Sequence, residues 1–285
     1  MTGPATITPG GSSATQAAQE AAGAAGCGPV IVLTYAHSGH ELLPGALSAS
    51  RAVACTHGTG LLPLCHSAVS TWQNVENRGT AASPLALKSV RMLVNTMTAA
   101  LQSAAGAARW CETAYTGRAA AETFLRVFPE ATLLCLHRSL PAVLADGIRA
   151  YPWGLGSSPF WYHAADHPGN NVATIAEYWV AHTEQLLALE EAHPQSCLRV
   201  RHEDLASEPH RHVSEIFARL GLDPQDLVEP GQPAPGRQPA GGTGRRQSAR
   251  DAGPGTPPPL MQMPPQLLAK ASDLHISLGY GPLTP

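Results

Sequence analysis

Residues 118–150, RAAAETFLRVFPEATLLCLHRSLPAVLADGIRA, carry the clearest structural pattern in the sequence. Residues 118–128 have helical periodicity, and Pro129 stops that helix because proline cannot continue the helical hydrogen bonds. The apolar run 131–137 is typical of a buried strand, and a second helical segment begins at Pro141. A helix, a strand and a helix at this spacing predict an α/β fold with a parallel sheet.

The pattern continues on both sides of this unit. Short apolar runs predict further buried strands, and longer segments with apolar residues at helical spacing predict helices. The first strand leads into a Gly-containing turn and an apolar helix. We expect a parallel sheet of four or five strands with helices on both faces. The further strands are predicted at 29–35, 51–56, 109–113 and 197–201, and the further helices at 84–105, 172–192, 210–220 and 264–278.

Two segments differ from this pattern in composition. Residues 1–27 contain almost no large apolar side chain, so we expect a disordered N-terminal tail. Residues 229–259 are dense in Pro and Gly and are predicted to form a loop. That loop lies within a single predicted domain, residues 28–285.

The charge and cysteine patterns exclude several classes of protein. The chain has a net charge of −3, and its two Lys and sixteen Arg are scattered rather than gathered in a stripe, so we expect no nucleic-acid partner. Its six cysteines show no CxxC spacing and are predicted to be buried free thiols. Since the sequence has neither a signal peptide nor an apolar run of membrane-spanning length, we expect a cytoplasmic protein without a membrane partner. The oligomeric state is left open.

Three segments occur in an order and spacing found in one known family. Residues 197–209, CLRVRHEDLASEP, followed by 216–223, IFARLGLD, correspond to a strand and then a helix ending in Leu-Gly-Leu. Residues 128–138, FPEATLLCLHR, correspond to a strand that ends in an arginine, and 30–43 to a strand with a loop after it. Over roughly residues 29–283, the chain resembles the bacterial sulfotransferases in the order, spacing and type of these elements.

This resemblance implies an α/β, P-loop-like sulfotransferase fold and a transferase activity. The implied donor is 3′-phosphoadenosine 5′-phosphosulfate, and the implied acceptor is the hydroxyl or amine of a small molecule, in specialised metabolism. No metal is expected. Because a shared fold does not by itself carry the chemistry, the site residues are compared with the family one by one.

The loop after the first strand resembles the family's 5′-phosphosulfate loop but differs from it at three positions. The family has Arg or Lys and then Ser-Gly-Thr-Thr, so that backbone N–H groups, a cation and hydroxyls surround the anion. Here Ser38 and Gly39 remain as donor-binding candidates. His37 stands in place of the cation, His40 replaces a hydroxyl, and Glu41 places a carboxylate beside the anion. We interpret His37 and His40 as candidate catalytic residues and Glu41 as a candidate substrate contact.

A second anion subsite is implied at the end of the strand 131–137. Arg138 corresponds to the arginine that the family delivers to the nucleotide 3′-phosphate, and Asp146 stands where the family often has a Ser. The acidic replacement predicts weak donor affinity, because a carboxylate within about 5 Å of a phosphate costs on the order of a few kcal/mol. Arg245 and Arg246, with Arg250, lie where the family has a loop that closes over the 3′-phosphate; a merely solvated basic loop is the alternative.

Two further segments are candidates for the acceptor side. Glu112 resembles the Glu of the family's Glu-Lys-Thr-Pro strand end and is the candidate general base; its alternative role is to pair with an Arg. His57 begins a His-Gly-Thr-Gly turn that either lines the acceptor pocket or is a tight turn capped by Thr59. The acidic pair Glu203 and Asp204 is interpreted as structural, capping the following helix and pairing with a nearby Arg.

Several alternatives remain open at the level of function. His37, His40 and Glu41 form with His57 or His66 a conceivable metal-ligand set, or they are loop polarity without function. The chain is a sulfotransferase-like enzyme, or an enzyme that has kept the fold and lost the donor and uses those loop residues with Glu112 for other acid/base chemistry. A third possibility is a non-catalytic binding protein. Titration with donor nucleotide separates the first from the other two.

Overall fold

The structure, a computed structural model, describes residues 28–48, 50, 52–75, 84–115, 117–223 and 260–284. The predicted tail 1–27 and the predicted loop 229–259, with its basic residues Arg245, Arg246 and Arg250, lie outside the described residues.

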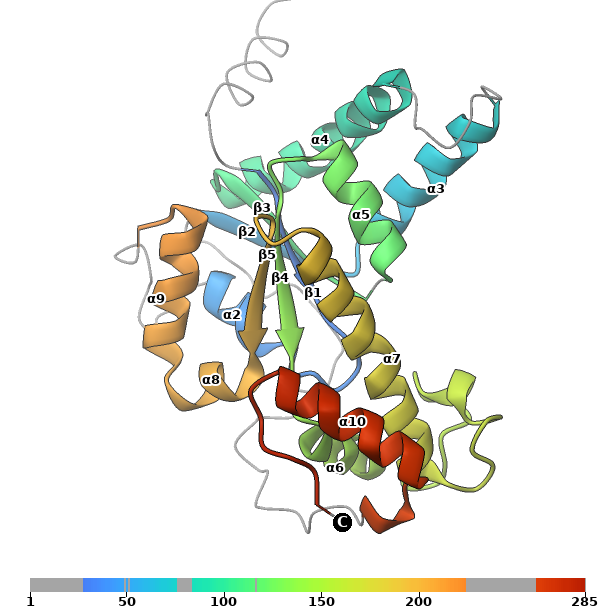
Figure 1. Cartoon of the computed structure of the whole chain (residues 1–285). Helices are drawn as coiled ribbons and strands as arrows, with labels where there is room; N and C mark the ends of the chain where they lie inside the picture. Colours follow the sequence, from blue (N-terminus) through green and yellow to red (C-terminus); the bar gives the residue numbers. More distant parts are fainter. Residues whose placement is uncertain are drawn as a thin grey trace, which may run out of the picture.

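A five-stranded sheet forms the centre of the fold (Figure 1). Every adjacent pair of strands is parallel, and the order across the sheet is β2-β3-β1-β4-β5. This confirms the predicted α/β fold and its parallel sheet. The strands are β1 (Val30–Leu33), β2 (Val53–His57), β3 (Arg109–Ala114), β4 (Thr132–His137) and β5 (Cys197–Arg201).

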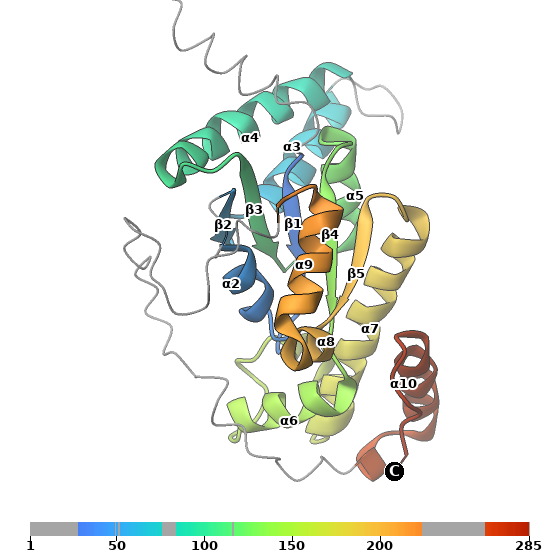
Figure 2. The same cartoon turned by 90° about the vertical axis from the view of Figure 1, so that its left-hand side faces the viewer.

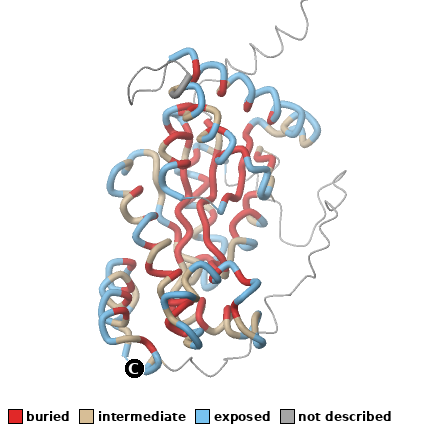
Figure 3. Tube along the Cα trace, turned by 90° about the vertical axis from the view of Figure 1, so that its right-hand side faces the viewer, coloured by how far each residue is buried: buried red, intermediate tan, exposed pale blue. Residues whose placement is uncertain are grey.

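The central strand β1 explains why the sheet has helices on both faces. Successive side chains of a strand point to opposite faces. Ile31 and Leu33 belong to one apolar cluster, whereas Val30 and Val32 belong to the other, and all four are at most 1% exposed. The strands at the centre of the molecule are accordingly buried along their length (Figure 3). A strand buried on both faces needs a continuous apolar run, which is what the sequence supplies.

Helices cover the two faces unequally (Figures 1 and 2). The smaller layer packs on the face of Val30 and Val32, and the larger layer packs on the face of Ile31 and Leu33. None of the helices in the described ranges is long and apolar enough to cross a membrane. The smaller layer contains α2 (Leu42–Ser48), α8 (His202–Ser207) and α9 (Pro209–Leu220); the larger contains α3 (Leu61–Val75), α4 (Pro84–Ala105), α5 (Arg118–Val127), α6 (Leu140–Ala150), α7 (Asn171–Ala192) and α10 (Pro265–Ser277).

Two helices were not predicted from the sequence. Helix α3 follows the His-Gly-Thr-Gly turn, and its mixed apolar and polar residues were not interpreted as a helix. Helix α8 occupies the segment that was expected to lead directly into α9; Pro209 begins the second helix, and Glu208 between them is not helical. Short 3₁₀ turns occur at Trp161–His163 and Leu260–Gln262.

The end of the sheet at which β3 begins is held by a buried arginine. Arg109 is 3% exposed; its Nε donates to the carbonyl of Gly28 over 2.9 Å, and Nη1 donates to the carbonyl of Leu220 at the end of α9. One side chain therefore joins the starts of β1 and β3 to the smaller helix layer. A charged donor of this kind is stabilising where it satisfies buried carbonyl groups.

We predict that Arg109→Met lowers the free energy of unfolding by about 2 to 5 kcal/mol, because two buried carbonyl groups lose their donor. Urea denaturation of both proteins measures the difference. The exposed Arg219→Met, on α9, is the matched control and should change stability by less than about 0.5 kcal/mol. Equal effects of the two substitutions would contradict a stabilising role for the hydrogen bonds from Arg109 to Gly28 and Leu220.

Candidate active site

The predicted site residues that the structure describes lie near the carboxyl ends of the strands. Because all five strands are parallel, their carboxyl ends lie together, and the chain places β2 and β3 on one side of β1 and β4 and β5 on the other. Ligands in open α/β sheets bind outside these ends, where the strand order reverses. The described residues that follow β1, β2, β3 and β4 are 34–41, 58–60, 115 with 117, and 138–139.

The loop between β1 and α2 turns sharply at two positions. His37 has φ +62° and Gly39 has φ +78°, in the left-handed region that favours glycine. A Cβ atom at Gly39 would lie 2.0 Å from Cδ2 of the His202 ring, so glycine is required both for its backbone conformation and for its contact with α8. The Ser-Gly pair retained in the sequence thus has a structural reason.

Buried hydroxyl groups hold the beginning of this loop. The hydroxyls of Thr34 and Ser38, both buried, form a short hydrogen bond with each other. The N–H of Ala36 donates to the hydroxyl of Tyr178 on α7 over 2.9 Å, and the N–H of Ser38 donates to the carbonyl of Tyr35 over 3.1 Å. Beyond Ser38, the N–H groups of residues 39–41 have no hydrogen-bond partner within the part of the chain that the structure describes. Such a turn of free N–H groups is suited to an anion.

Arg138 joins β4 to the loop. Its backbone N–H donates to the Tyr35 hydroxyl over 2.9 Å, and its carbonyl accepts from Trp179 Nε1 over 2.9 Å. In its side chain, Nη1 donates to the carbonyl of His37 over 2.7 Å and to Asp146 over 2.6 Å. Its Nε is buried without a partner among the described residues. The Nε–H is therefore a buried donor that the described residues leave unsatisfied.

Asp146 is the partner of two arginines. Its carboxylate lies 2.6 Å from Arg138 Nη1 and 3.3 Å from Arg149 Nη2. The cluster of these three residues has a net charge of +1, so the acidic replacement does not make the subsite negative. It does occupy donors of Arg138 that an anion would otherwise use.

Two imidazoles border this arginine cluster. The ring of His37 stacks on Phe160 at a centroid distance of 5.5 Å and meets the edge of Tyr151 at 6.0 Å. Burial lowers the pKa of His37, and nearby Arg138 adds to that effect against Asp146. Burial and Arg138 lower the pKa of His202 in the same way. Since the ordinary histidine pKa is about 6.5, both rings are mainly neutral at pH 7.

A second group of side chains surrounds His40. The ring of His40 meets that of Tyr115, which follows β3, at a centroid distance of 5.2 Å. Burial lowers the pKa of His40, the carboxylate of Glu41 opposes that shift, and His57 supports it. Both Glu41 and His57 are exposed. The structure thus brings His40, Glu41 and His57 together with a tyrosine.

The carboxylate of Glu112 is hydrogen-bonded to the turn after β2. It is 1% exposed, Oε1 accepts from the N–H of Thr59 over 3.0 Å, and Oε2 accepts from the hydroxyl of Thr59 over 2.5 Å. Burial raises the pKa of Glu112, and the Thr59 bonds limit that rise. Its partner is therefore Thr59, and its role as a base stays a prediction. The remaining candidate ligand of a metal, His66, bonds Thr123 over 3.0 Å, and no group of metal-ligating side chains occurs among the described residues.

The acidic pair of the third matching segment has two separate roles. Glu203 accepts from the N–H of Ser139 over 2.9 Å and from the Tyr280 hydroxyl, so it joins the end of β4 to the C-terminal segment. Asp204 lies 3.8 Å from Arg201. Both belong to the first turn of α8, where carboxylates interact favourably with the helix dipole. Neither makes a side-chain hydrogen bond that caps α9.

Several residues of this edge were not found from the sequence. His202 and Arg149 border Arg138 through α8 and α6, and Tyr178 and His182 reach the loop from α7. His202 lies within a segment that matches the family, but the site prediction for that segment concerned only the acidic pair next to it. For Tyr178 and His182 the sequence gives no local signal, because both lie inside a long helix.

Comparisons with known proteins agree with the fold. A family model described as the sulfotransferase family matches residues 29–226. The sulfotransferase domain from the Synechococcus PCC 7002 olefin synthase is similar in fold, with a TM-score of 0.56 and 17% identity over 90% of this chain and 95% of that one. The sulfotransferase domain from the curacin biosynthetic pathway has a TM-score of 0.53 and 16% identity over 73% and 79%. No curated protein matches the sequence.

We predict that Tyr35→Phe lowers the free energy of unfolding by about 1 to 3 kcal/mol, because the buried N–H of Arg138 loses its acceptor. Urea denaturation measures the change. Tyr162→Phe removes the same atom from a side chain that is 71% exposed and should have almost no effect. A Tyr35 variant as stable as this control would show that the Arg138 backbone finds another partner.

Proposed function

Because this chain belongs to the sulfotransferase family, we propose that it transfers a sulfuryl group from 3′-phosphoadenosine 5′-phosphosulfate to a hydroxyl or amine of a small molecule in specialised metabolism. Family and fold support a sulfotransferase-like activity. The donor and the acceptor class are the proposal. The observation that carries it is the position of Arg138, whose guanidinium bonds the carbonyl of His37 and keeps an unpartnered Nε, at the loop with the free N–H groups of residues 39–41.

These groups fit the two anionic parts of such a donor. The loop N–H groups and Ser38 would hold the 5′-phosphosulfate, and Arg138 with Arg149 and His202 would hold the 3′-phosphate. Charged donors of this kind form hydrogen bonds about twice as strong as neutral ones. A bound phosphate would also raise the pKa of a neighbouring imidazole, because an opposite charge favours the protonated form. His37, neutral in the free protein at pH 7, would become a cation when the donor is bound.

In the transfer step the protein itself forms no covalent bond. The acceptor oxygen or nitrogen attacks sulfur, the bond from sulfur to the 5′-phosphate oxygen breaks, and the electron pair of that bond stays on the phosphate. Catalysis then consists of positioning the two reactants and of stabilising the charge on the departing oxygen. In this chain the loop N–H groups and a protonated His37 would supply that stabilisation.

One observation favours the alternative enzyme, which keeps the fold and uses another ligand. His37 and His40 both have lowered pKa values, and Glu41 is exposed next to them, so the loop presents two neutral imidazoles and one carboxylate. Such groups are suited to acid/base chemistry at neutral pH. Calorimetric titration with adenosine 3′,5′-bisphosphate distinguishes the two: saturable binding supports the sulfotransferase, and its absence supports the alternative.

We predict that Asp146→Ser tightens the binding of adenosine 3′,5′-bisphosphate by roughly tenfold to a hundredfold, because it removes a carboxylate and frees donors of Arg138 and Arg149. Titration calorimetry measures the dissociation constant. Asp273→Ser removes the same charge from an exposed position on α10 and should leave it unchanged. An unchanged constant for Asp146→Ser would contradict the placement of the 3′-phosphate here.

We predict that the affinity of the wild type for the same nucleotide falls as pH rises through the lowered pKa of His37, since the imidazole loses its charge. The arginine of His37→Arg keeps its charge at pH 8. This variant should therefore bind the nucleotide more tightly than the wild type at pH 8, by roughly tenfold or about 1.4 kcal/mol. His37→Asn, which also tolerates a positive φ, is the uncharged control. Ionisation of the nucleotide's own phosphates affects the binding of both variants equally. If His37→Arg binds no better than His37→Asn at pH 8, His37 is not part of the anion site.

A further inference from the structure

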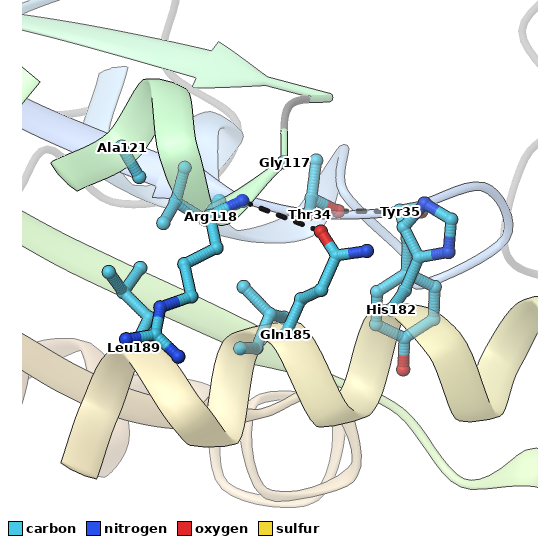
Figure 4. A pocket seen from close by; sticks show the side chains of 10 residues that line it. Thr34, Tyr35, Gly117, Arg118, Ala121, His182, Gln185 and Leu189 are labelled. Atoms are coloured by element: carbon cyan, nitrogen blue, oxygen red, sulfur yellow. Dashed lines mark hydrogen bonds between the residues drawn. The ribbon is translucent and has the colours of Figure 1, made fainter. Parts of the chain in front are cut away.

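A recess opens between α5 and α7 at the end of β1 (Figure 4). The recess is narrow and has room for about one water-sized group, such as a hydroxyl or an amine. Polar groups from three elements surround the recess. They belong to Thr34, Tyr35, Arg118, His182 and Gln185.

Two contacts join this recess to the loop between β1 and α2. Thr34 lines the recess, and its hydroxyl bonds that of Ser38. The ring of His182 lies 4.0 Å, between centroids, from that of Tyr178, whose hydroxyl accepts from the N–H of Ala36. A group held in the recess would therefore lie next to the loop proposed to hold the sulfuryl group.

The hydrogen bonding of His182 determines its tautomer. Nδ1 lies 2.9 Å from the carbonyl oxygen of Tyr178, and a carbonyl can only accept, so Nδ1 carries the proton. In the neutral ring Nε2 then carries a lone pair, and it has no hydrogen-bond partner within the described ranges. Burial lowers the pKa of His182, with a contribution from His163, so the ring is neutral at pH 7. The helix thus presents an oriented base.

Glu112, the other candidate base, is less available. Its two carboxylate oxygens accept hydrogen bonds from Thr59, and it is 1% exposed. A base must come within hydrogen-bond distance of the proton that it removes. His182 is half-buried and lines the recess, whereas Glu112 does not.

We propose that the recess between α5 and α7 holds the acceptor hydroxyl or amine and that His182 Nε2 accepts its proton during sulfuryl transfer. This inference rests on the proposed function. As the acceptor atom bonds to sulfur, its proton passes to Nε2, and the pair of the breaking sulfur–oxygen bond stays on the 5′-phosphate. The imidazolium then releases its proton to solvent.

The surroundings of His182 set its pH dependence. The titratable groups facing it are Tyr35 of the loop after β1, Tyr178 of its own helix and His163 of the 3₁₀ turn. Arg118 of α5 also lines the recess, and its charge is paired with Glu122 over 2.6 Å. At saturating donor, kcat should rise with pH through a pKa below 6.5 and stay level above it, because only the neutral ring accepts a proton.

The test uses full-length protein, the sulfuryl donor, and 2-naphthol, a simple alcohol and a simple amine as acceptor probes. His182→Gln should lower kcat at least 100-fold, as expected for a lost general base, and leave the dissociation constant of adenosine 3′,5′-bisphosphate within twofold. In His182→Ala, added imidazole should restore part of the lost rate. His193→Gln, at the end of the same helix, is the matched control and should retain wild-type kcat.

Each other outcome contradicts a defined part of the argument. An active His182→Gln, or a His182→Ala that imidazole does not rescue and that binds the nucleotide more weakly, overturns the assignment of His182 and leaves the proposed function intact. A wild type that binds the nucleotide but transfers to none of the three probes contradicts the proposed function, and this inference falls with it.

Discussion

The hydrogen bonds around the backbone of Arg138 are the constraint on which the site depends. The residue follows β4, and its N–H and carbonyl can no longer pair within the sheet. Tyr35 after β1 and Trp179 on α7, at most 1% exposed, supply the hydroxyl and the indole N–H that these groups need. Because buried polar groups must be paired, the ends of the two central strands and α7 are fixed relative to one another. These hydrogen bonds also fix the position of the loop of residues 34–41, because Tyr35 belongs to that loop.

The electrostatics of the site follow from what surrounds this constraint. Arg138 and Arg149 share the carboxylate of Asp146, which leaves one positive charge for the cluster. The imidazoles of His37 and His202 add none at pH 7, since burial lowers their pKa values. The free site is thus weakly charged and rich in neutral groups that can become cations. Under the proposed function, a bound anion would raise the pKa values of the two rings, because an opposite charge favours their protonated form.

The sequence predicted the fold better than the site, for a physical reason. Strands such as 131–137 and helices such as 84–105 are defined by local periodicity, which needs no knowledge of distant residues. The resemblance also located the loop at residues 36–41. Partnerships across the fold have no such local signal: that Glu112 bonds Thr59 and that Asp146 bonds Arg149 depends on how elements pack. The sequence did not single out His182 for the same reason. It lies inside a long amphipathic helix, whose pattern accounts for each residue without a functional role.

The two imidazoles of the loop between β1 and α2 contact different neighbours. His37 turns toward Phe160 and Arg138, whereas His40 turns toward Tyr115, and the positive φ angles at His37 and Gly39 reverse the chain between them. In phosphoryl transfer the attacking and leaving atoms lie roughly in line on opposite sides of the group that moves. Transfer of a sulfuryl group, which is equally tetrahedral, has the same requirement. Under the proposed function, the loop N–H groups hold the leaving 5′-phosphate, and the acceptor approaches from the recess between α5 and α7, which Thr34 lines beside Ser38.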